Sequence, residues 1–168
     1  LGWIEDPSNR ESVSARNSLR LTVMPALEAA VPGARDNLVR AAALARDAQQ
    51  VLDEVAGQDL AAARSMAAAR LSAEPAPLVA LLSAPGRPAA LHRQALMTLG
   101  GARQRLVLRT WLAQSGVGVP SHAVLAELHK QLLASEATYG EVIRAGAVLR
   151  RYRDWLWVDR DDAAPALP

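Results

Sequence analysis

The chain has 168 residues, a formal net charge of +2 and no cysteine. Without cysteine there are no disulfides, no thiolate nucleophile and no cysteine-based zinc site, which suits a cytoplasmic location. No apolar run approaches the roughly 18–20 residues that span a bilayer, and Glu5 and Asp6 interrupt the first residues too early for a signal peptide. Apolar residues make up 51% of the sequence, and the many alanines among them favour a helix-dominated fold with close-packed interfaces.

Basic residues concentrate in the second half of the chain. Residues 84–160 carry 11 basic and 5 acidic side chains, and 18 of the 19 basic residues of the whole chain are arginine. Because the guanidinium group matches the geometry of phosphate oxygens, this distribution indicates a surface for a polyanion. A GC-rich coding bias would produce the same arginine content without any such partner.

The N-terminal part predicts a loop and one kinked helix. Residues 1–9 read as an extended loop, and Ser12 is a suitable N-cap for a helix that runs to about residue 30. Pro25 lies inside this helix and should kink or divide it. A Val-Pro-Gly break follows at residues 31–33.

A second helix of about 35 residues should follow. Apolar side chains recur there at steps of three and four, and a Glu-Pro-Ala-Pro sequence at residues 74–77 ends the pattern. The recurring positions are Leu38, Ala41, Ala45, Ala48, Leu52, Val55, Ala62 and Met66. We expect this seam of small residues to be core and not a cofactor site, and it would let another helix approach closely.

Shorter elements make up the remainder. A short apolar turn is expected at residues 78–82, followed by helices at residues 88–99, 102–114 and 123–134. A period of two then indicates strands at residues 141–144, 147–152 and 155–158. The sequence therefore predicts a mainly α fold: a helical domain with one long helix and a small C-terminal β-hairpin or meander. The acidic, proline-rich residues 161–168 are expected to be a linker or disordered end.

The first group of polar residues with a possible function lies near the N-terminus. Arg16, Asn17 and Arg20 follow a loop that holds Asp6 and Asn9. On a helix, Arg16 and Arg20 share one face four residues apart, which suits an anionic partner. Asp6 and Asn9 can equally satisfy local backbone donors as an Asx turn, which would be a purely structural role.

A second group lies on the helix predicted at residues 102–114. Arg105 and Arg109 share one face of it, and its apolar side chains form the buried side. Arg93 and Lys130 could extend this basic patch along an RNA backbone. The alternative is a solvated arginine face over an ordinary helix.

A third group lies on the strand predicted at residues 147–152. Alternation places Arg150 and Tyr152 on one face, and Arg151 and Arg153 on the other. Basic residues interleaved with aromatic ones fit single-stranded or loop RNA, whose bases can stack. The two tryptophans that follow could instead cover a helix.

These three groups, in this order, resemble the tRNA(Ile)-lysidine synthetases. That family has an Asp-x-x-Asn loop followed by an Arg-Asn-x-x-Arg helix, then an arginine-rich helix that ends in Arg-x-Trp-Leu, then an Arg-Arg-Tyr strand. The matching segments here are residues 6–9, 16–20, 102–112 and 150–152. One departure is that Ser14 and Ala15 stand where the family commonly has an aromatic residue before Arg-Asn.

The resemblance implies that the chain is a fragment of such an enzyme. Residues 1–32 would be the C-terminal end of the catalytic domain with a connecting helix, and residues 33–160 the helical tRNA- and substrate-binding domain. In that family ATP, with magnesium, adenylates the wobble cytidine in the CAU anticodon of tRNA(Ile), and free lysine displaces AMP. The candidates for holding nucleotide or fixing the domain contact are Asp6, Asn9, Arg16, Asn17 and Arg20. The candidates for tRNA binding are Arg93, Arg105, Arg109, Lys130, Arg150, Arg151 and Arg153.

No catalytic constellation appears in the chain itself. There is no Ser-Gly-Gly-x-Asp-Ser phosphate loop, and His92, His122 and His129 lack the spacing of metal ligands. We therefore expect no ligase activity, no metal site and no bound cofactor in this chain alone. The open alternative is a helical protein–protein interaction module, without RNA binding, whose long alanine-rich helix pairs with a copy of itself or with a partner protein.

Overall fold

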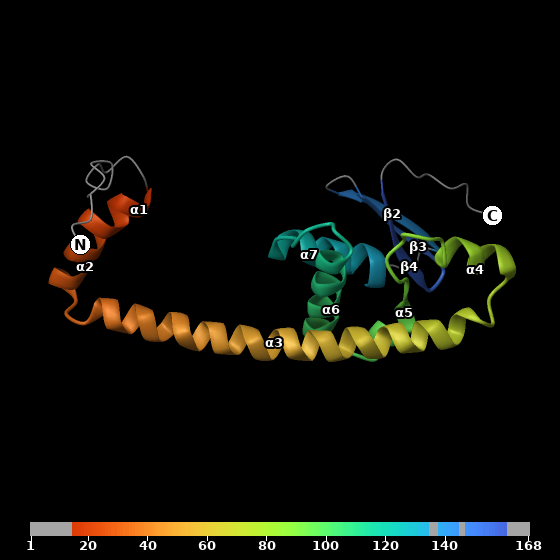
Figure 1. Cartoon of the computed structure of the whole chain (residues 1–168), viewed down its shortest axis with the longest axis horizontal. Helices are drawn as coiled ribbons and strands as arrows, with labels where there is room; N and C mark the ends of the chain where they lie inside the picture. The colour runs from red at the N-terminus through yellow and green to blue at the C-terminus, as the bar shows by residue number, and fades with distance from the viewer. Residues whose placement is uncertain (1–14, 135–137, 145–146, 161–168) are drawn as a thin grey trace, which may run out of the picture. The chain divides into compact units, whose positions relative to one another are not determined.

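The fold is mainly α with a small C-terminal sheet, as the sequence predicts (Figure 1). The computed structural model describes residues 15–134, 138–144 and 147–160. These residues form two compact units that divide between Gln50 and Val51. The predicted N-terminal loop, the Ser12 cap and the C-terminal segment 161–168 lie outside the described residues, and the predicted domain boundary at residue 32 stays a prediction.

The N-terminal unit begins with a helix that changes type in its middle. Its parts are α1 (Ala15–Ser18), the π-helical turn η2 (Leu19–Val23) and α2 (Met24–Ala30). Pro25 has no backbone N–H for a bond to the preceding turn, so a regular α-helix cannot continue through it. The backbone stays helical through Val23 and Met24, so the helix changes from π to α geometry just before Pro25 and is not divided there.

The start of the long helix α3 (Ala34–Leu71) is set by Glu28. Glu28 Oε1 accepts the backbone N–H of Gly33 at 2.8 Å, and Oε2 accepts that of Arg35 at 2.9 Å. These two hydrogen bonds lower the pKa of the Glu28 carboxyl. Gly33, with φ of +82°, makes the turn that this cap requires.

The buried face of α3 differs from the predicted seam. Leu38 and Leu52 are 51% and 42% exposed, and Met66 is also exposed. The buried α3 residues are Ala34, Ala56, Asp59, Leu60, Ala63 and Ala67. In the second half of the helix this face lies one position beyond the predicted Val55, Ala62 and Met66. Alanines stand on both faces, so the apolar pattern could not tell which face packs.

Shorter helices follow α3 and one of them corrects a prediction. They are α4 (Ala76–Leu82), α5 (Arg93–Met97), α6 (Gly101–Gln114) and α7 (His122–His129), which continues as the π-helical turn η3 (Lys130–Ala134). The predicted helix at residues 88–99 is wrong in its first half, because Leu91–His92 forms a strand, β1. Leu91 pairs with Leu156 of the C-terminal sheet, and this tertiary pairing overrides the local helical pattern.

The C-terminal sheet contains the predicted meander. Its strands β2 (Tyr139–Arg144), β3 (Ala147–Tyr152) and β4 (Trp155–Arg160) confirm the period-two segments. The strand order is β1-β4-β3-β2 and all neighbours are antiparallel. Arg153, with φ of 53°, lies in the turn between β3 and β4, and its backbone N–H donates to the carbonyl of Thr138 at 2.6 Å.

Buried side chains cover both faces of this sheet. Leu149 and Val158 lie opposite each other and belong to the same core cluster as Trp111 of α6 and Leu128 of α7. Trp157 lies in a second cluster, with side chains of α3 and α4. The two clusters therefore pack side chains against opposite faces of the sheet. Within the described residues, no helix has the combination of length and apolar character that crossing a membrane requires.

Candidate nucleic-acid interface

The apolar face of helix α6 is buried in the core, and its arginine side chains lie on the other faces. Val107, Leu108, Trp111 and Leu112 are each 0% exposed, and the Trp111 indole N–H donates to the carbonyl of Ala89 at 3.1 Å. Apart from Gln104, which is also buried, the other positions of the helix are exposed or half-buried. Three of them are arginines.

Two of these arginines line a groove that α6 forms with the loop and helix that follow it. The groove has a volume of about 510 Å³. Arg105 and Arg109 of α6 line it together with His122 at the start of α7, and we call it the basic groove. Its other described lining residues are Leu52, Ala102, Leu106, Val119, Pro120 and Leu125. None of the described lining residues is acidic, so the groove offers hydrogen-bond donors and positive charge on apolar walls.

A partly buried polar contact joins α6 to α7. His129 Nε2 lies 2.6 Å from Gln104 Oε1, and Gln104 Nε2 donates to the carbonyl of Leu99 at 2.8 Å. Burial lowers the pKa of His129, and the nearby positive charge of Arg105 lowers it further. A neutral His129 thus supports the groove without adding charge to it.

The third arginine of α6 has a different role. Arg103 Nε donates to Asp59 Oδ2 at 2.8 Å, and Arg103 Nη2 lies 2.5 Å from Asp59 Oδ1. Asp59 is 8% exposed on α3, whereas the Arg103 side chain is 54% exposed. This two-point contact ties α6 to α3 and raises the pKa of Arg103 through the hydrogen bond to Asp59. Arg103 is therefore a structural residue beside the basic groove.

Two of the arginines predicted to bind tRNA are buried in the sheet. Arg150, which is 9% exposed, lies 3.1 Å from Glu141 Oε2 and 3.2 Å from Asp159 Oδ2. Arg151, which is 4% exposed, donates to the carbonyls of Arg153 and Leu132. Because both guanidinium groups are buried and contact other groups of the protein, we do not include Arg150 and Arg151 in the proposed RNA-binding surface.

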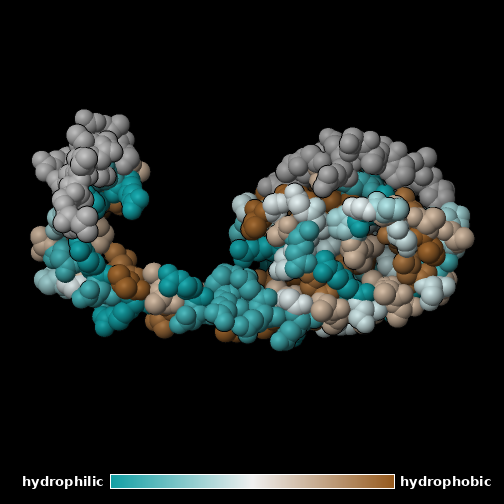
Figure 2. Space-filling view, viewed as in Figure 1, coloured by the Kyte–Doolittle hydropathy of each residue, from teal (hydrophilic) through white to brown (hydrophobic). Residues whose placement is uncertain are grey.

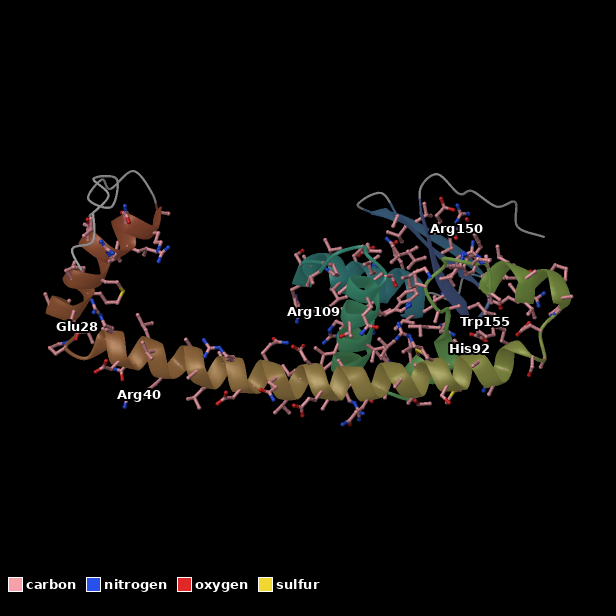
Figure 3. The ribbon with its side chains drawn as sticks, in the orientation of Figure 1. Glu28, Arg40, His92, Arg109, Arg150 and Trp155 are labelled. Carbon is pink, nitrogen blue, oxygen red and sulfur yellow. The ribbon has the colours of Figure 1, made fainter. Side chains whose placement is uncertain are left out.

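The other predicted tRNA-binding residues, Arg93, Lys130 and Arg153, do not line the basic groove. Arg93 Nε donates to the carbonyl of Leu133 at 2.8 Å, and its Nη1 lies 3.5 Å from Asp154 Oδ1. Lys130 is exposed and lines another cavity, of about 570 Å³, beside β2. Arg153 is exposed, with its guanidinium carbon 5.2 Å from the centre of the Tyr152 ring. Of the predicted residues, the structure thus brings together Arg105 and Arg109 in one groove (Figure 3 labels Arg109).

Among the N-terminal candidates, the described ones lie on the first helix. Arg16 and Arg20 are exposed and Asn17 is half-buried. Asp6 and Asn9 lie outside the described residues. The described residues also hold no group of three or more His, Asp or Glu side chains that could bind a metal ion.

Sequence reasoning assigned no chemistry to His122, which joins the basic groove. It follows Ser121, the N-cap residue of α7, and the short loop after α6 brings it to the same groove as Arg109. The length of this loop could have indicated His122 in the sequence, because a connection of a few residues places the start of one helix near the end of the previous one.

Comparisons with known proteins give a consistent result. Residues 91–157 match the family model described as TilS substrate binding domain. The chain is 39% identical over 166 residues to a tRNA(Ile)-lysidine synthase of Burkholderia pseudomallei, and 35% identical over 160 residues to one of Ralstonia nicotianae. It is 30% identical over 158 residues to one of Escherichia coli O157:H7. These alignments cover 94–98% of this chain but only 30–32% of the relatives, so the chain spans about a third of their length.

Proposed function

Since this chain belongs to the tRNA(Ile)-lysidine synthase family, we propose that it supplies a tRNA-contacting surface of such an enzyme, centred on the basic groove. The observation that carries the proposal is the pair Arg105 and Arg109, which line one groove without an acidic neighbour among its described lining residues. Arginine donors at this spacing suit successive phosphate oxygens of an RNA backbone. Both arginines lie inside the segment that matches the substrate binding domain.

The activity of the whole enzyme is part of the same proposal. The full protein would ligate lysine to the wobble cytidine of a CAU anticodon, using ATP with magnesium, in the cytoplasm. This chain would contribute RNA contacts that orient the tRNA, because holding a substrate in position lowers the entropy cost of the reaction. The N-terminal residues Arg16, Asn17 and Arg20, with Asp6 and Asn9, stay candidates for contacts to nucleotide or to a catalytic domain.

Salt-dependent binding tests the groove. We would measure the affinity of the chain for tRNA(Ile) with a CAU anticodon, and for tRNA(Met), over a range of salt concentrations. Replacing Arg105 and Arg109 together by Gln should weaken binding and reduce the slope of log affinity against log salt by about 2, since each lost phosphate contact removes about 0.9. A preference for tRNA(Ile) would place part of the specificity in this chain.

A matched control separates the groove from overall charge. Arg40 and Arg46 are exposed on α3, outside the groove lining, and replacing both by Gln removes the same net charge. This control should leave the salt slope almost unchanged. Equal losses in the two double variants, or no binding of the unmodified chain at low salt, would contradict the proposal.

Exposed apolar residues on α3 favour the alternative of helix pairing. Leu38, Leu44 and Val51 are 51–70% exposed, and hydrophobic patches appear along this part of the chain in Figure 2. Burying such side chains against a second copy would be favourable, by about 25 cal/mol for each Å² of apolar surface. A mass that rises with concentration, measured by sedimentation in the absence of RNA, would support a homodimer.

A further inference from the structure

A third cavity lies beside the second core cluster, the one that contains Trp157. It has a volume of about 300 Å³ and lies among the end of α3, α4 and the segment before β1. Arg64, Ala67, Leu82, Arg87 and Trp155 are among its lining residues, and it shares no described lining residue with the basic groove. We call it the Arg64–Arg87 cavity.

Arg87 reaches this cavity with part of its guanidinium group unused. Its side chain is 9% exposed, and Nη2 lies 2.5 Å from Asp159 Oδ1. Nη1 of the same group is buried and no described protein group accepts its hydrogen bond. Leaving a buried charged donor unsatisfied costs more than an ordinary lost hydrogen bond, so such an atom indicates a binding role.

Arg64 provides a second donor of the same kind. It projects from α3, lines the same cavity, and its Nε is buried without a hydrogen-bond acceptor among the described residues. Two guanidinium groups therefore face one small space from two different segments of the chain. No described lining residue is acidic; the counter-charge of Arg87, Asp159, lies outside the lining, and Arg87 Nη1 and Arg64 Nε stay without an acceptor among the described residues.

The aromatic wall of the cavity is fixed in place. The Trp155 indole N–H donates to Glu74 Oε1 at 3.0 Å, and the His92 ring packs against the indole edge-to-face with centres 4.9 Å apart (Figure 3). Since its N–H is used on Glu74, Trp155 offers the cavity apolar surface only. Ala67 and Leu82 extend this apolar wall.

We propose that the Arg64–Arg87 cavity is a phosphate-binding site in which Arg64 Nε–H and Arg87 Nη1–H donate to one phosphate group. Guanidinium donors that line one cavity match the oxygens of a phosphate monoester or diester. A volume of about 300 Å³ is at the small end for ligand sites, which fits one phosphate group with an attached small moiety on the apolar wall. The phosphate could belong to a nucleotide of a bound RNA or to a free phosphate ester.

Arginine side-chain NMR tests the proposal on the whole chain. The Nε–Hε resonances of Arg64 and Arg87 would be followed during a titration with inorganic phosphate, and both should shift in a saturable way. Arg64→Gln should weaken phosphate binding at least about tenfold, because it removes one charge-assisted hydrogen bond. Arg40→Gln, which removes an exposed charge elsewhere on α3, should leave it unchanged.

A second pair of variants avoids disturbing the buried ion pair of Arg87. Ala68 is exposed at the cavity and lines it, whereas Ala69 is exposed and does not. Ala68→Leu should therefore reduce phosphate binding by a similar factor, and Ala69→Leu should not. Absence of saturable shifts at Arg64 and Arg87, or unchanged binding in both Arg64→Gln and Ala68→Leu, would overturn the proposal.

Two short RNA oligonucleotides distinguish the source of the phosphate. One carries a 5′ phosphate and the other a 5′ hydroxyl. If only the first shifts Arg64, the site takes a phosphate monoester; if both do, it takes the backbone diester. The site stands apart from the proposed function, since loss of groove-dependent tRNA binding would leave the inorganic phosphate titration unaffected.

Discussion

His129 Nε2 lies 2.6 Å from Gln104 Oε1, and this contact joins α7 to α6 beside the basic groove. Gln104 Nε2 is already donating to the carbonyl of Leu99, so Oε1 is the atom that faces the imidazole. An amide oxygen only accepts, and His129 must therefore carry its proton on Nε2. This assignment follows from the hydrogen-bond network and it makes Gln104 the residue that orients the ring.

The stability of the chain should fall as the pH is lowered below the ordinary histidine pKa of about 6.5. Burial lowers the pKa values of His129 and His92, with further lowering by Arg105 and Arg70 respectively. In this range the unfolded chain binds protons more tightly than the folded chain, so acidification favours unfolding until the pH passes below the lowered folded values. Thermal unfolding measured from about pH 5 to 8 checks this.

Two variants locate the source of this pH dependence. His129→Gln should reduce the slope of melting temperature against pH, because one of the two imidazoles with a lowered pKa is gone. His122 is exposed, and His122→Gln should leave the slope as it is. Identical slopes in both variants and in the unmodified chain would contradict the assignment to His129.

Asp59→Asn should destabilise the contact between α3 and α6. The substitution keeps the size of the side chain but removes the charge that Arg103 contacts at two points. Because Asp59 is buried, we expect the melting temperature to fall by several degrees. Asp47→Asn, at an exposed position of the same helix, is the control and should change it little. A double variant with Arg103→Gln should lose less than the sum of the single changes if the two residues act together.

Asp159→Asn should be among the most damaging changes in the sheet. Asp159 lies 2.5 Å from Arg87, 3.2 Å from Arg150, and accepts the Trp157 indole N–H at 2.9 Å. Its loss leaves Arg87 without its counter-charge and Arg150 with Glu141 alone, and the expected cost is about 3–5 kcal/mol of unfolding free energy. Urea denaturation measures it. The exposed Glu127→Gln should stay within about 0.5 kcal/mol of the unmodified chain, and a similarly small effect of Asp159→Asn would refute this account.

The chain alone is expected to show no ligase activity. Its sequence contains no Ser-Gly-Gly-x-Asp-Ser phosphate loop with which to bind ATP for adenylation. Incubation with ATP, magnesium, labelled lysine and tRNA(Ile) should leave the RNA unlabelled. Lysine incorporation by the pure chain that depends on ATP would show the expectation to be wrong.

The candidate site was only partly visible in the sequence. Helical spacing placed Arg105 and Arg109 on one face, and the groove they line confirms that proximity. Reasoning from strand alternation likewise treated Arg150 and Arg151 as accessible candidates for tRNA binding. Whether a charged strand residue faces solvent depends on what covers each face of the sheet, and here side chains pack on both. The acidic partner of Arg150, Asp159, comes from the neighbouring strand.

The sequence by itself determined the long helix, the three-stranded meander and the order of the arginine-rich segments, because these depend on local periodicity and on residues close together in the chain. Only the tertiary structure decided which face of α3 is buried, since an alanine-rich helix offers several faces of similar apolar character. It also decided that Leu91–His92 is a strand and that Arg64 and Arg87 share one cavity. Those outcomes depend on contacts between distant segments, which no local pattern encodes.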